Sequence, residues 1–519
     1  MSAIAVIGAG PTGTCLVERI LANAPELVGD AALDVHVVDP HPYGSLSGAF
    51  ERAVQTAPAN VRVHVHTDEA TGLADLPGIQ RVELADGRWL EADAVVLAQG
   101  RYSVPPAPEE VAQSGFAARH DLVYLPTGHA ADLPLDAIPA GQRVLVRGAG
   151  LAFFDLMDLL TTGRGGRFTR AGDGEPVYRP SGAEPLLHVG SRRGVPLHAR
   201  TGYRLAEFPP GPPRFLTPGA LPSDGGELRT LVAKELAYAY YRELFTAHPS
   251  RTRLGPAAFL DAFAAAEWGG REMRALVTKA VPRFADRLHL DRLERPLRGI
   301  RFGDSAGLQR WMHGYLAADL ERRADPAYSA DLAMIHGLLA VRAVLAEASP
   351  DPWFQGLFAF LAGGPPATRL AELRALARAG VVTFLGADPR IEQEERTGAW
   401  RATSPTVPGA IEARALVEAR LPAPSVSRST DPLIGGLYAR GEIRDAAGLL
   451  DVRPADGRLL GQDGVPHPRR FALGRWTAGW HAAAGFARPG ADAPLFLHAD
   501  MLARTVLTQT AAAGRRAAA

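Results

Sequence analysis

Residues 4–13 read Ile-Ala-Val-Ile-Gly-Ala-Gly-Pro-Thr-Gly, a run with the character of a buried strand that ends in a Gly-x-Gly-x-x-Gly pattern. Glycine lets the backbone come close to a pyrophosphate, and the helix that follows turns its N-terminal N–H groups toward the phosphates. Asp39 closes the next apolar run, 35–38, and can accept hydrogen bonds from a ribose hydroxyl. This order predicts a Rossmann-like dinucleotide site. Its residues are Gly8, Gly10, Pro11, Thr12, Gly13, Asp39 and Pro40.

A second glycine turn follows another buried strand. Residues 144–147 read Val-Leu-Val-Arg and lead into Gly148-Ala-Gly150, after which a helix is expected through residue 160. Phe153 stands where the third glycine of the fingerprint belongs, so we expect looser packing of helix on strand and a crowded pyrophosphate position. The pattern predicts a second, imperfect nucleotide-binding unit.

The composition indicates several domains and no charge-driven partner. A chain of 519 residues exceeds one ordinary core, and its 56 basic and 56 acidic residues cancel, so no global field attracts nucleic acid or an anionic membrane. Cys15 is the single cysteine, which rules out an internal disulfide. His64 and His66 share a strand face, but no third ligand is indicated, so no metal is expected. We find no signal peptide and no apolar run near the roughly 20 residues of a membrane helix, and expect a cytoplasmic protein.

The expected fold class is α/β, with two Rossmann-like dinucleotide-binding units and a large helical insertion. Strand patterns place the first unit in residues 1–105 and again in 381–510, so it is discontinuous. The second unit covers residues 106–220. Residues 221–380 have helical patterns almost throughout, and the alanine-rich tail 511–519 is expected to be disordered.

These pieces resemble the FAD/NAD(P)-binding flavoproteins, and most closely the flavin-dependent hydroxylases of the urate-hydroxylase and N-hydroxylating types. The matching segments are Gly8–Gly13, Asp39–Pro40, Ala92–Gly100, Gly148–Gly150 and Phe471–Gly474. The resemblance implies FAD on the first glycine turn. It also implies that the chain crosses near the cofactor at the end of the 94–100 strand and that the 474–477 turn lies beside the flavin. The residues it adds to the FAD site are Val65, Gln99, Gly100, Arg101, Gly474, Trp476 and Thr477.

By the same resemblance, the second glycine turn takes a nicotinamide cofactor. The strand after it closes with an arginine pair where an acid would favour a ribose 2′-hydroxyl, and arginine binds a 2′-phosphate bidentately. We therefore expect NADPH. Its residues are Gly148, Gly150, Leu151, Ser191, Arg192 and Arg193. The alternative is a remnant Rossmann subdomain whose arginine pair is solvated.

The function that this combination favours is an FAD- and NADPH-dependent monooxygenase acting on a small molecule with O₂. Two alternatives stay open. A flavin oxidase or dehydrogenase that inserts no oxygen is favoured by the degraded second motif. A non-catalytic cofactor-binding partner protein is the other. No residue is recognisable as a catalytic base, and the sequence does not encode the substrate or the oligomeric state.

One segment is unusually short. Only Gly-Ser-Leu-Ser-Gly, residues 44–48, separates Tyr43 from a helix expected over 49–56. The resemblance implies a long segment here that covers the flavin, so the bridge reflects natural shortening or an engineered loop replacement. We hypothesise that the substrate side of the flavin is more open than in relatives and that reduced flavin loses electrons to oxygen.

Overall fold

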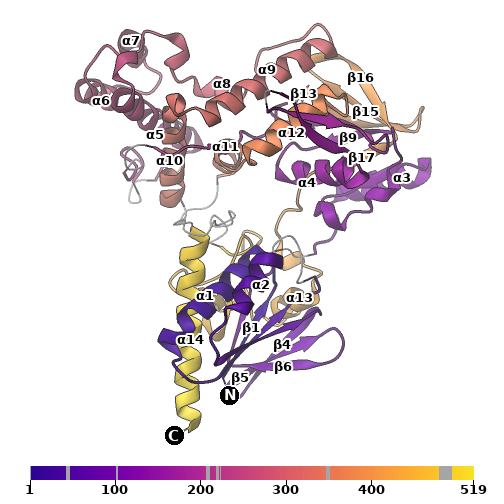
Figure 1. The fold of residues 1–519 in the computed structure, drawn as a ribbon, viewed down its shortest axis with the longest axis vertical. Coiled ribbons are helices and arrows are strands. Elements are labelled where there is room, and N and C mark those ends of the chain that lie inside the picture. The colour runs from indigo at the N-terminus through magenta and orange to yellow at the C-terminus, as the bar shows by residue number, and fades with distance from the viewer. Residues whose placement is uncertain are drawn as a thin grey trace. The chain divides into compact units, whose positions relative to one another are not determined.

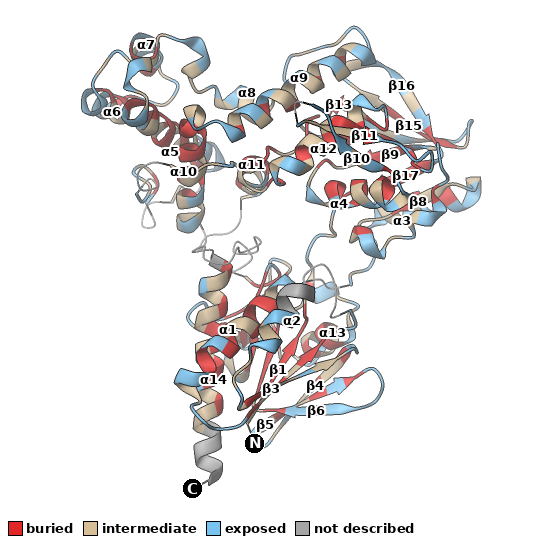
Figure 2. Cartoon of the chain, in the orientation of Figure 1, coloured by how far each residue is buried: buried red, intermediate tan, exposed pale blue. Residues whose placement is uncertain are grey.

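The computed structural model describes residues 2–41, 47–100, 103–172, 174–205, 211–217, 221–222, 224–345, 351–478 and 494–518 (Figure 1). The chain forms two compact units: unit 1 is Met1–Pro105 with Pro422–Ala519, and unit 2 is Pro106–Leu421. Each unit has its own largely parallel sheet, which confirms the predicted α/β fold with two Rossmann-like units. Figure 2 shows the buried residues gathered along the strands of both sheets and on the inner sides of the helices.

Unit 1 is built on a six-stranded sheet of order β20-β21-β7-β1-β2-β3, in which all neighbours are parallel except β20 and β21. The central strands β1 and β7 are buried along most of their length, as expected where helices cover both faces of a parallel sheet. The strands are β1 (Ser2–Ile7), β2 (Leu33–Val38), β3 (Val61–His66), β7 (Ala94–Leu97), β20 (Arg458–Leu460) and β21 (Pro466–Ala472).

Helices α1 (Pro11–Leu27) and α14 (Pro494–Ala518) pack against each other in unit 1. The turn at Gly87, which has a φ of +85°, joins two strands of a small antiparallel sheet, as the Asp-Gly pair predicts. The remaining elements of unit 1 are α2 (Ser47–Gln55), β4 (Ala70–Leu76), β5 (Ile79–Leu84), β6 (Trp89–Ala92), α13 (Pro432–Ala439), β18 (Asp445–Ala446) and β19 (Leu449–Leu450).

Unit 2 is built on a five-stranded parallel sheet of order β13-β12-β9-β17-β8. Its strands are β8 (Val123–Leu125), β9 (Arg143–Arg147), β12 (Leu186–Ser191), β13 (Val382–Ala387) and β17 (Ala415–Glu418). The smaller sheets are β10 (Arg167–Arg170) with β11 (Pro176–Arg179), and β14 (Arg390–Glu394), β15 (Ala399–Ser404) and β16 (Val407–Ala413). Helices α3 (Pro108–His120), α4 (Leu151–Leu160), α9 (Ser305–Ala324) and α12 (Ala367–Arg378) accompany the large sheet.

The described residues between Gly225 and Arg378 form helices and no strand, as the sequence pattern predicts. Besides α9 and α12, they are α5 (Gly225–Ala247), α6 (Pro256–Ala265), α7 (Arg271–Ala280), α8 (Leu290–Glu294), α10 (Ser329–Leu345) and α11 (Pro352–Ala362). By length and composition alone, the stretch Pro326–Leu345 could cross a membrane, so the expectation that no run comes near that length was wrong. Half of its window is buried, and α10 packs along α5 as a core helix does.

Two domain boundaries differ from those predicted. Residues 381–421 were expected in the first unit, but β13 pairs with β12 and β17 pairs with β9, both in unit 2. Period-2 patterns identify a strand without identifying its partner, which explains the error. The predicted disordered tail is also wrong, since α14 continues to Ala518, and alanine has the highest helix propensity. Of the short bridge, Ser47 and Gly48 open α2, while residues 44–46 lie outside the described part of the chain.

Candidate functional site

The three glycines of the first turn have different roles. Gly8 has a φ of +109°, and a Cβ atom there would lie 2.8 Å from the carbonyl oxygen of Ala98 at the end of β7. A Cβ on Gly13 would lie 1.8 Å from the carbonyl oxygen of Gly8, so only glycine lets α1 pack on the turn. Nothing lies within 4 Å of a Cβ on Gly10. The turn is therefore closed on the protein side and open at Gly10, where a phosphate approaches in this motif.

Asp39, directly after β2, holds the glycine turn through its carboxylate. Its Oδ2 accepts a hydrogen bond from the backbone N–H of Ala9 at 2.6 Å, and its Oδ1 accepts one from His41 at 2.7 Å. A carboxylate oxygen has further lone pairs, so both can still accept from a ribose hydroxyl. Pro40 is exposed beside it, and Val65 lies one residue before the end of β3, paired with Val37.

The end of β7 contributes a buried acceptor without a donor. The Nε2 of Gln99 donates to the Oδ2 of Asp431 at 3.4 Å, but its Oε1 is buried with no hydrogen-bond partner in the described part of the chain. The next residue, Gly100, accepts a hydrogen bond on its carbonyl oxygen from the indole Nε1 of Trp476. Arg101 lies outside the described residues.

The turn after β21 reaches the same edge of the sheet. Gly474 has a φ of +123°, and a Cβ there would lie 3.3 Å from the side chain of Thr12. Thr477 is buried and donates from Oγ1 to the carbonyl oxygen of Gly474 at 2.6 Å. The carboxyl ends of β1, β7 and β21 thus meet where the strand order reverses, which is where ligands bind in open α/β sheets. The open Gly10 and the unpaired Gln99 Oε1 fit a bound dinucleotide.

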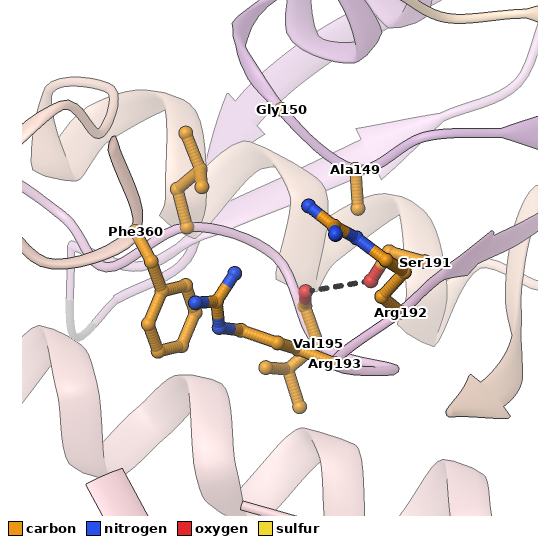
Figure 3. A pocket seen from close by; sticks show the side chains of 8 residues that line it. Ala149, Gly150, Ser191, Arg192, Arg193, Val195 and Phe360 are labelled. Carbon is orange, nitrogen blue, oxygen red and sulfur yellow. Dashed lines mark hydrogen bonds between the residues drawn. The ribbon is translucent and has the colours of Figure 1, made fainter. Parts of the chain in front are cut away.

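Unit 2 has a pocket of about 140 Å³ beside its own glycine turn (Figure 3). This is below the roughly 300–1,000 Å³ of a complete small-molecule site, so it matches part of a cofactor. Gly148 has a φ of +128°, and a Cβ there would lie 2.5 Å from the carbonyl oxygen of Ala419 after β17, whereas nothing lies within 4 Å of a Cβ on Gly150. The pocket is lined by Ala149, Gly150, Ser191, Arg192, Arg193, Val195, Leu197 and Phe360.

Phe153 does not crowd this pocket, so that expectation was wrong. The ring is fully buried in the core of unit 2 and is not among the residues that line the cavity. The backbone N–H of Phe153 bonds to Gly150 at 3.0 Å, three residues back, whereas in unit 1 Thr14 bonds to Gly10 at 2.9 Å, four residues back. The tighter first turn of α4 accommodates a side chain at the third position of the motif.

The two arginines after β12 are not equivalent. The Nε of Arg193 donates to the carbonyl oxygen of Glu294 at 2.9 Å, and its guanidinium carbon lies 4.5 Å from the ring centre of Phe360. Burial lowers the pKa of Arg193. Arg192 is exposed, extends toward Ala149 in Figure 3, and has no ion pair or side-chain hydrogen bond within the described ranges. Arg192 is therefore free to bind an anion, and Arg193 is held by the helical part of unit 2.

Other predicted residues complete this edge. The Oγ of Ser191 donates to the carbonyl oxygen of Val195 at 3.2 Å and so shapes the turn that carries both arginines. Leu151 opens α4 and is 42% exposed, but it does not line the cavity. The second turn and the arginine pair therefore meet at one pocket, with Leu151 at its margin.

Sequence reasoning missed a buried network behind the pocket. The Nδ1 of His198 lies 2.6 Å from the Oδ1 of Asp319, whose Oδ2 accepts from the backbone N–H of Ala199 at 2.8 Å. The hydroxyl of Tyr315 lies 3.4 Å from the Nε2 of His198. These contacts fix the segment that follows Arg193. No sequence signal links His198 to an acid 121 residues away.

A third histidine joins the pair on β3. The ring of His36 on β2 stacks on that of His64, with centres 4.9 Å apart, and its Nδ1 lies 3.0 Å from the Nε2 of His66. Burial lowers the pKa of His36 to about 4. Across the described residues, no group of three or more His, Cys, Asp or Glu side chains could hold a metal ion.

Comparison with known proteins gives the following matches. The FAD-NAD(P)-binding family matches residues 5–49 and 46–102. An L-aspartate N-monooxygenase (nitrosuccinate-forming) of Streptomyces davaonensis is 32% identical, over 97% of both chains. The enzyme of the same name from Streptomyces cremeus is 36% identical, over 91% of this chain and 76% of its own. Nitrosuccinic acid synthase npaA of Aspergillus oryzae is 31% identical, over 97% of this chain and 92% of its own.

Two solved structures cover nearly the whole chain at low similarity. OTEMO in complex with FAD and NADP is 12% identical, covers 99% of this chain and 84% of its own, and has a TM-score of 0.39. Cyclohexanone monooxygenase from Rhodococcus sp. Phi1 bound to NADP⁺ is 14% identical, covers 99% of this chain and 85% of its own, and has a TM-score of 0.37.

The two glycine turns and the matching family define a flavoprotein of the FAD-NAD(P)-binding class. The chain belongs to the flavin-dependent N-monooxygenase family of the curated relatives, and it is an FAD-dependent monooxygenase that acts on a small molecule with O₂. The predicted monooxygenase function is therefore confirmed. An oxidase without oxygen insertion and a non-catalytic partner protein are set aside.

Proposed function

We propose that this enzyme oxygenates the amino group of L-aspartate to nitrosuccinate, with NADPH as reductant. The observation that carries the proposal is the 32% identity to an L-aspartate N-monooxygenase over 97% of both chains. Each oxygen insertion takes two electrons from NADPH, places one oxygen atom of O₂ on nitrogen and releases the other as water. Three insertions, with loss of one water from the doubly hydroxylated nitrogen, convert the amine to a nitro group. A cytoplasmic location stays a prediction.

We assign FAD to unit 1. Gly10 lets the pyrophosphate approach the N-terminus of α1, where unpaired N–H groups and the helix dipole favour negative charge. Asp39 accepts from the ribose hydroxyls, and Gln99 supplies its unpaired Oε1 to a donor on the cofactor. When bound, FAD accepts electrons from the reduced nicotinamide and transfers them to O₂ for insertion. The protein positions the cofactor and the substrate, excludes water from the site and balances the charge of the bound groups.

We assign the phosphate end of NADPH to the unit 2 pocket. The open Gly150 at the start of α4 receives the pyrophosphate, and Arg192 binds the 2′-phosphate. Arg193 supports the turn through Glu294 and Phe360 and does not contact the ligand. This division of roles supports NADPH over NADH, because at the ribose 2′ position only NADPH offers an anion to a free guanidinium.

Three readings of the FAD-loaded enzyme test the proposal. Anaerobic addition of NADPH is expected to bleach the flavin absorbance. In air, NADPH oxidation and O₂ uptake are expected to rise when L-aspartate is added, and nitrosuccinate is expected by mass spectrometry. D-Aspartate and L-asparagine serve as matched controls of the same size. If L-aspartate gives no N-oxygenated product while another amine does, the substrate assignment is wrong. If NADH bleaches the flavin as well as NADPH does, the cofactor assignment is wrong.

A further inference from the structure

Arg475 lies between two anchored residues at the carboxyl edge of the unit 1 sheet. On one side, Gly474 packs against Thr12 of the first glycine turn. On the other, the indole of Trp476 is bound to the carbonyl oxygen of Gly100. The backbone N–H of Thr477 donates to Gly474 at 3.1 Å and closes a tight turn with Arg475 at its second position. The backbone of residue 475 is thus held where the segments of the flavin site converge, and its side chain is exposed.

Among the residues that the structure describes, no carboxylate pairs with this guanidinium. In the part of the chain that the structure describes, Arg475 makes no ion pair and no hydrogen bond, and its one ring contact is Trp476, whose centre is 6.0 Å from the guanidinium carbon. Several other arginines of unit 1 are paired with acids, among them Arg470 with Glu442 and Arg504 with Glu26. An arginine side chain is charged at neutral pH. An uncompensated cation beside a flavin site is a site for an anion.

The substrate under the proposed function carries two carboxylates beside the amine that must reach the flavin. We propose that Arg475 binds a carboxylate of this amino dicarboxylic acid and is a specificity-determining residue; this rests on the proposed function. The planar fork of a guanidinium matches a carboxylate in two parallel hydrogen bonds, which a point charge does not reproduce. The FAD phosphates are the other anions expected nearby. The proposal places them at the N-terminus of α1 beside the open Gly10, so they do not require Arg475.

The test measures binding of succinate, a dicarboxylate without an amine, to the oxidised FAD-loaded enzyme by the change in the flavin spectrum. Loss of a charge-assisted pair corresponds to about 10- to 100-fold in affinity, so Arg475→Gln is expected to weaken succinate binding by that factor. Arg475→Lys is expected to recover only part of it. Arg504→Gln is the control, because its exposed pair with Glu26 lies at the opposite end of α1. In Arg504→Gln, succinate affinity, FAD affinity and anaerobic bleaching by NADPH are expected to be unchanged.

The inference is overturned if succinate does not perturb the wild-type flavin, or binds Arg475→Gln as tightly as wild type. It is also overturned if Arg475→Gln weakens FAD binding while the FAD-loaded fraction binds succinate normally, since Arg475 would then serve the cofactor phosphates. The proposed function is tested separately by nitrosuccinate formation. If wild type gives no product from L-aspartate but its succinate affinity depends on Arg475, the proposed function fails and the carboxylate site stands.

Discussion

The indole N–H of Trp476 donates a hydrogen bond to the backbone carbonyl of Gly100, across 376 residues of sequence. The bond ties the turn after β21 to the end of β7, and it is made by a side chain that is 4% exposed. The contact adds to the pairing of β7 with β21 and joins two edges of the proposed FAD site. The contact gives the first prediction.

Trp476→Phe keeps the ring and removes the donor. Because a hydrogen bond of this kind contributes about 0.5–1.5 kcal/mol, we expect the dissociation constant of FAD to rise about 2- to 10-fold. Titration of apoprotein with FAD by fluorescence measures it. Trp89→Phe, at a ring that is 58% exposed, is the matched control and is expected to bind FAD normally. Equal affinity in wild type and Trp476→Phe would contradict the prediction.

The glycines of the first turn are expected to separate folding from cofactor binding. Gly13→Ala places a Cβ 1.8 Å from the carbonyl oxygen of Gly8, so the melting temperature of the apoprotein should fall and FAD binding should be lost with it. Gly10→Ala has open space and an ordinary φ of −64°, so the apoprotein should melt normally while FAD affinity drops more than 10-fold. Melting of apoprotein and FAD titration of both variants check this. A destabilised Gly10→Ala apoprotein would argue that the turn is not open there.

The arginine pair of unit 2 is expected to divide by role. Arg192→Gln should raise the KM for NADPH about 10- to 100-fold, through loss of a charge-assisted contact, and leave the KM for NADH unchanged. Arg193→Gln should instead lower the melting temperature, because it removes the contacts with Glu294 and Phe360. Steady-state kinetics with both nucleotides and thermal melting decide between the two roles. The same loss of NADPH preference in both variants would show that the pair acts together.

Stability is expected to depend on pH through His188. Its Nδ1 lies 2.6 Å from the Oγ1 of Thr383, and its Nε2 is buried with no hydrogen-bond partner among the described residues. Burial lowers the pKa of His188 to about 4. The unfolded chain binds a proton on this histidine more tightly than the folded chain does. The contribution of neutral His188 to the free energy of unfolding is therefore complete above about pH 6.5 and is lost as pH falls toward 4. At pH 5 the loss amounts to about 1–2 kcal/mol. His188→Asn, which keeps the acceptor, should show a smaller fall in melting temperature between pH 7 and pH 5. A fall as large as in wild type would exclude His188.

The short bridge at residues 44–48 gives a prediction about coupling, the share of consumed NADPH that yields product and not hydrogen peroxide. The family match breaks into residues 5–49 and 46–102, and the alignment with the Streptomyces davaonensis enzyme spans 634 positions against 519 residues here. If the relatives carry their extra residues at the bridge, less of the chain is available to shield reduced flavin from oxygen. We expect more hydrogen peroxide per NADPH consumed than in that enzyme at saturating substrate. Equal coupling in the two enzymes would refute the hypothesis.

Local patterns identified the parts of the molecule that depend on short-range geometry. The first glycine turn, Asp39, the Gly87 hairpin and the helical stretch between Gly225 and Arg378 were predictable because periodicity and glycine conformations are properties of neighbouring residues. The pairing of β13 and β17 with the second sheet was not predictable. Strand partners are selected by packing between distant segments, and an alternating hydrophobic pattern does not identify the partner strand.

The sequence by itself determined that this protein has two dinucleotide turns and that glycine is needed in each. Only the tertiary structure decided that Phe153 turns into the core and that Arg193 contacts Phe360. It also decided that, among the residues the structure describes, neither Arg192 nor Arg475 has an acidic partner. The physical reason is the same in each case. Whether a side chain is available to a ligand depends on its burial and on partners far along the chain. The neighbouring residues in the sequence predict neither.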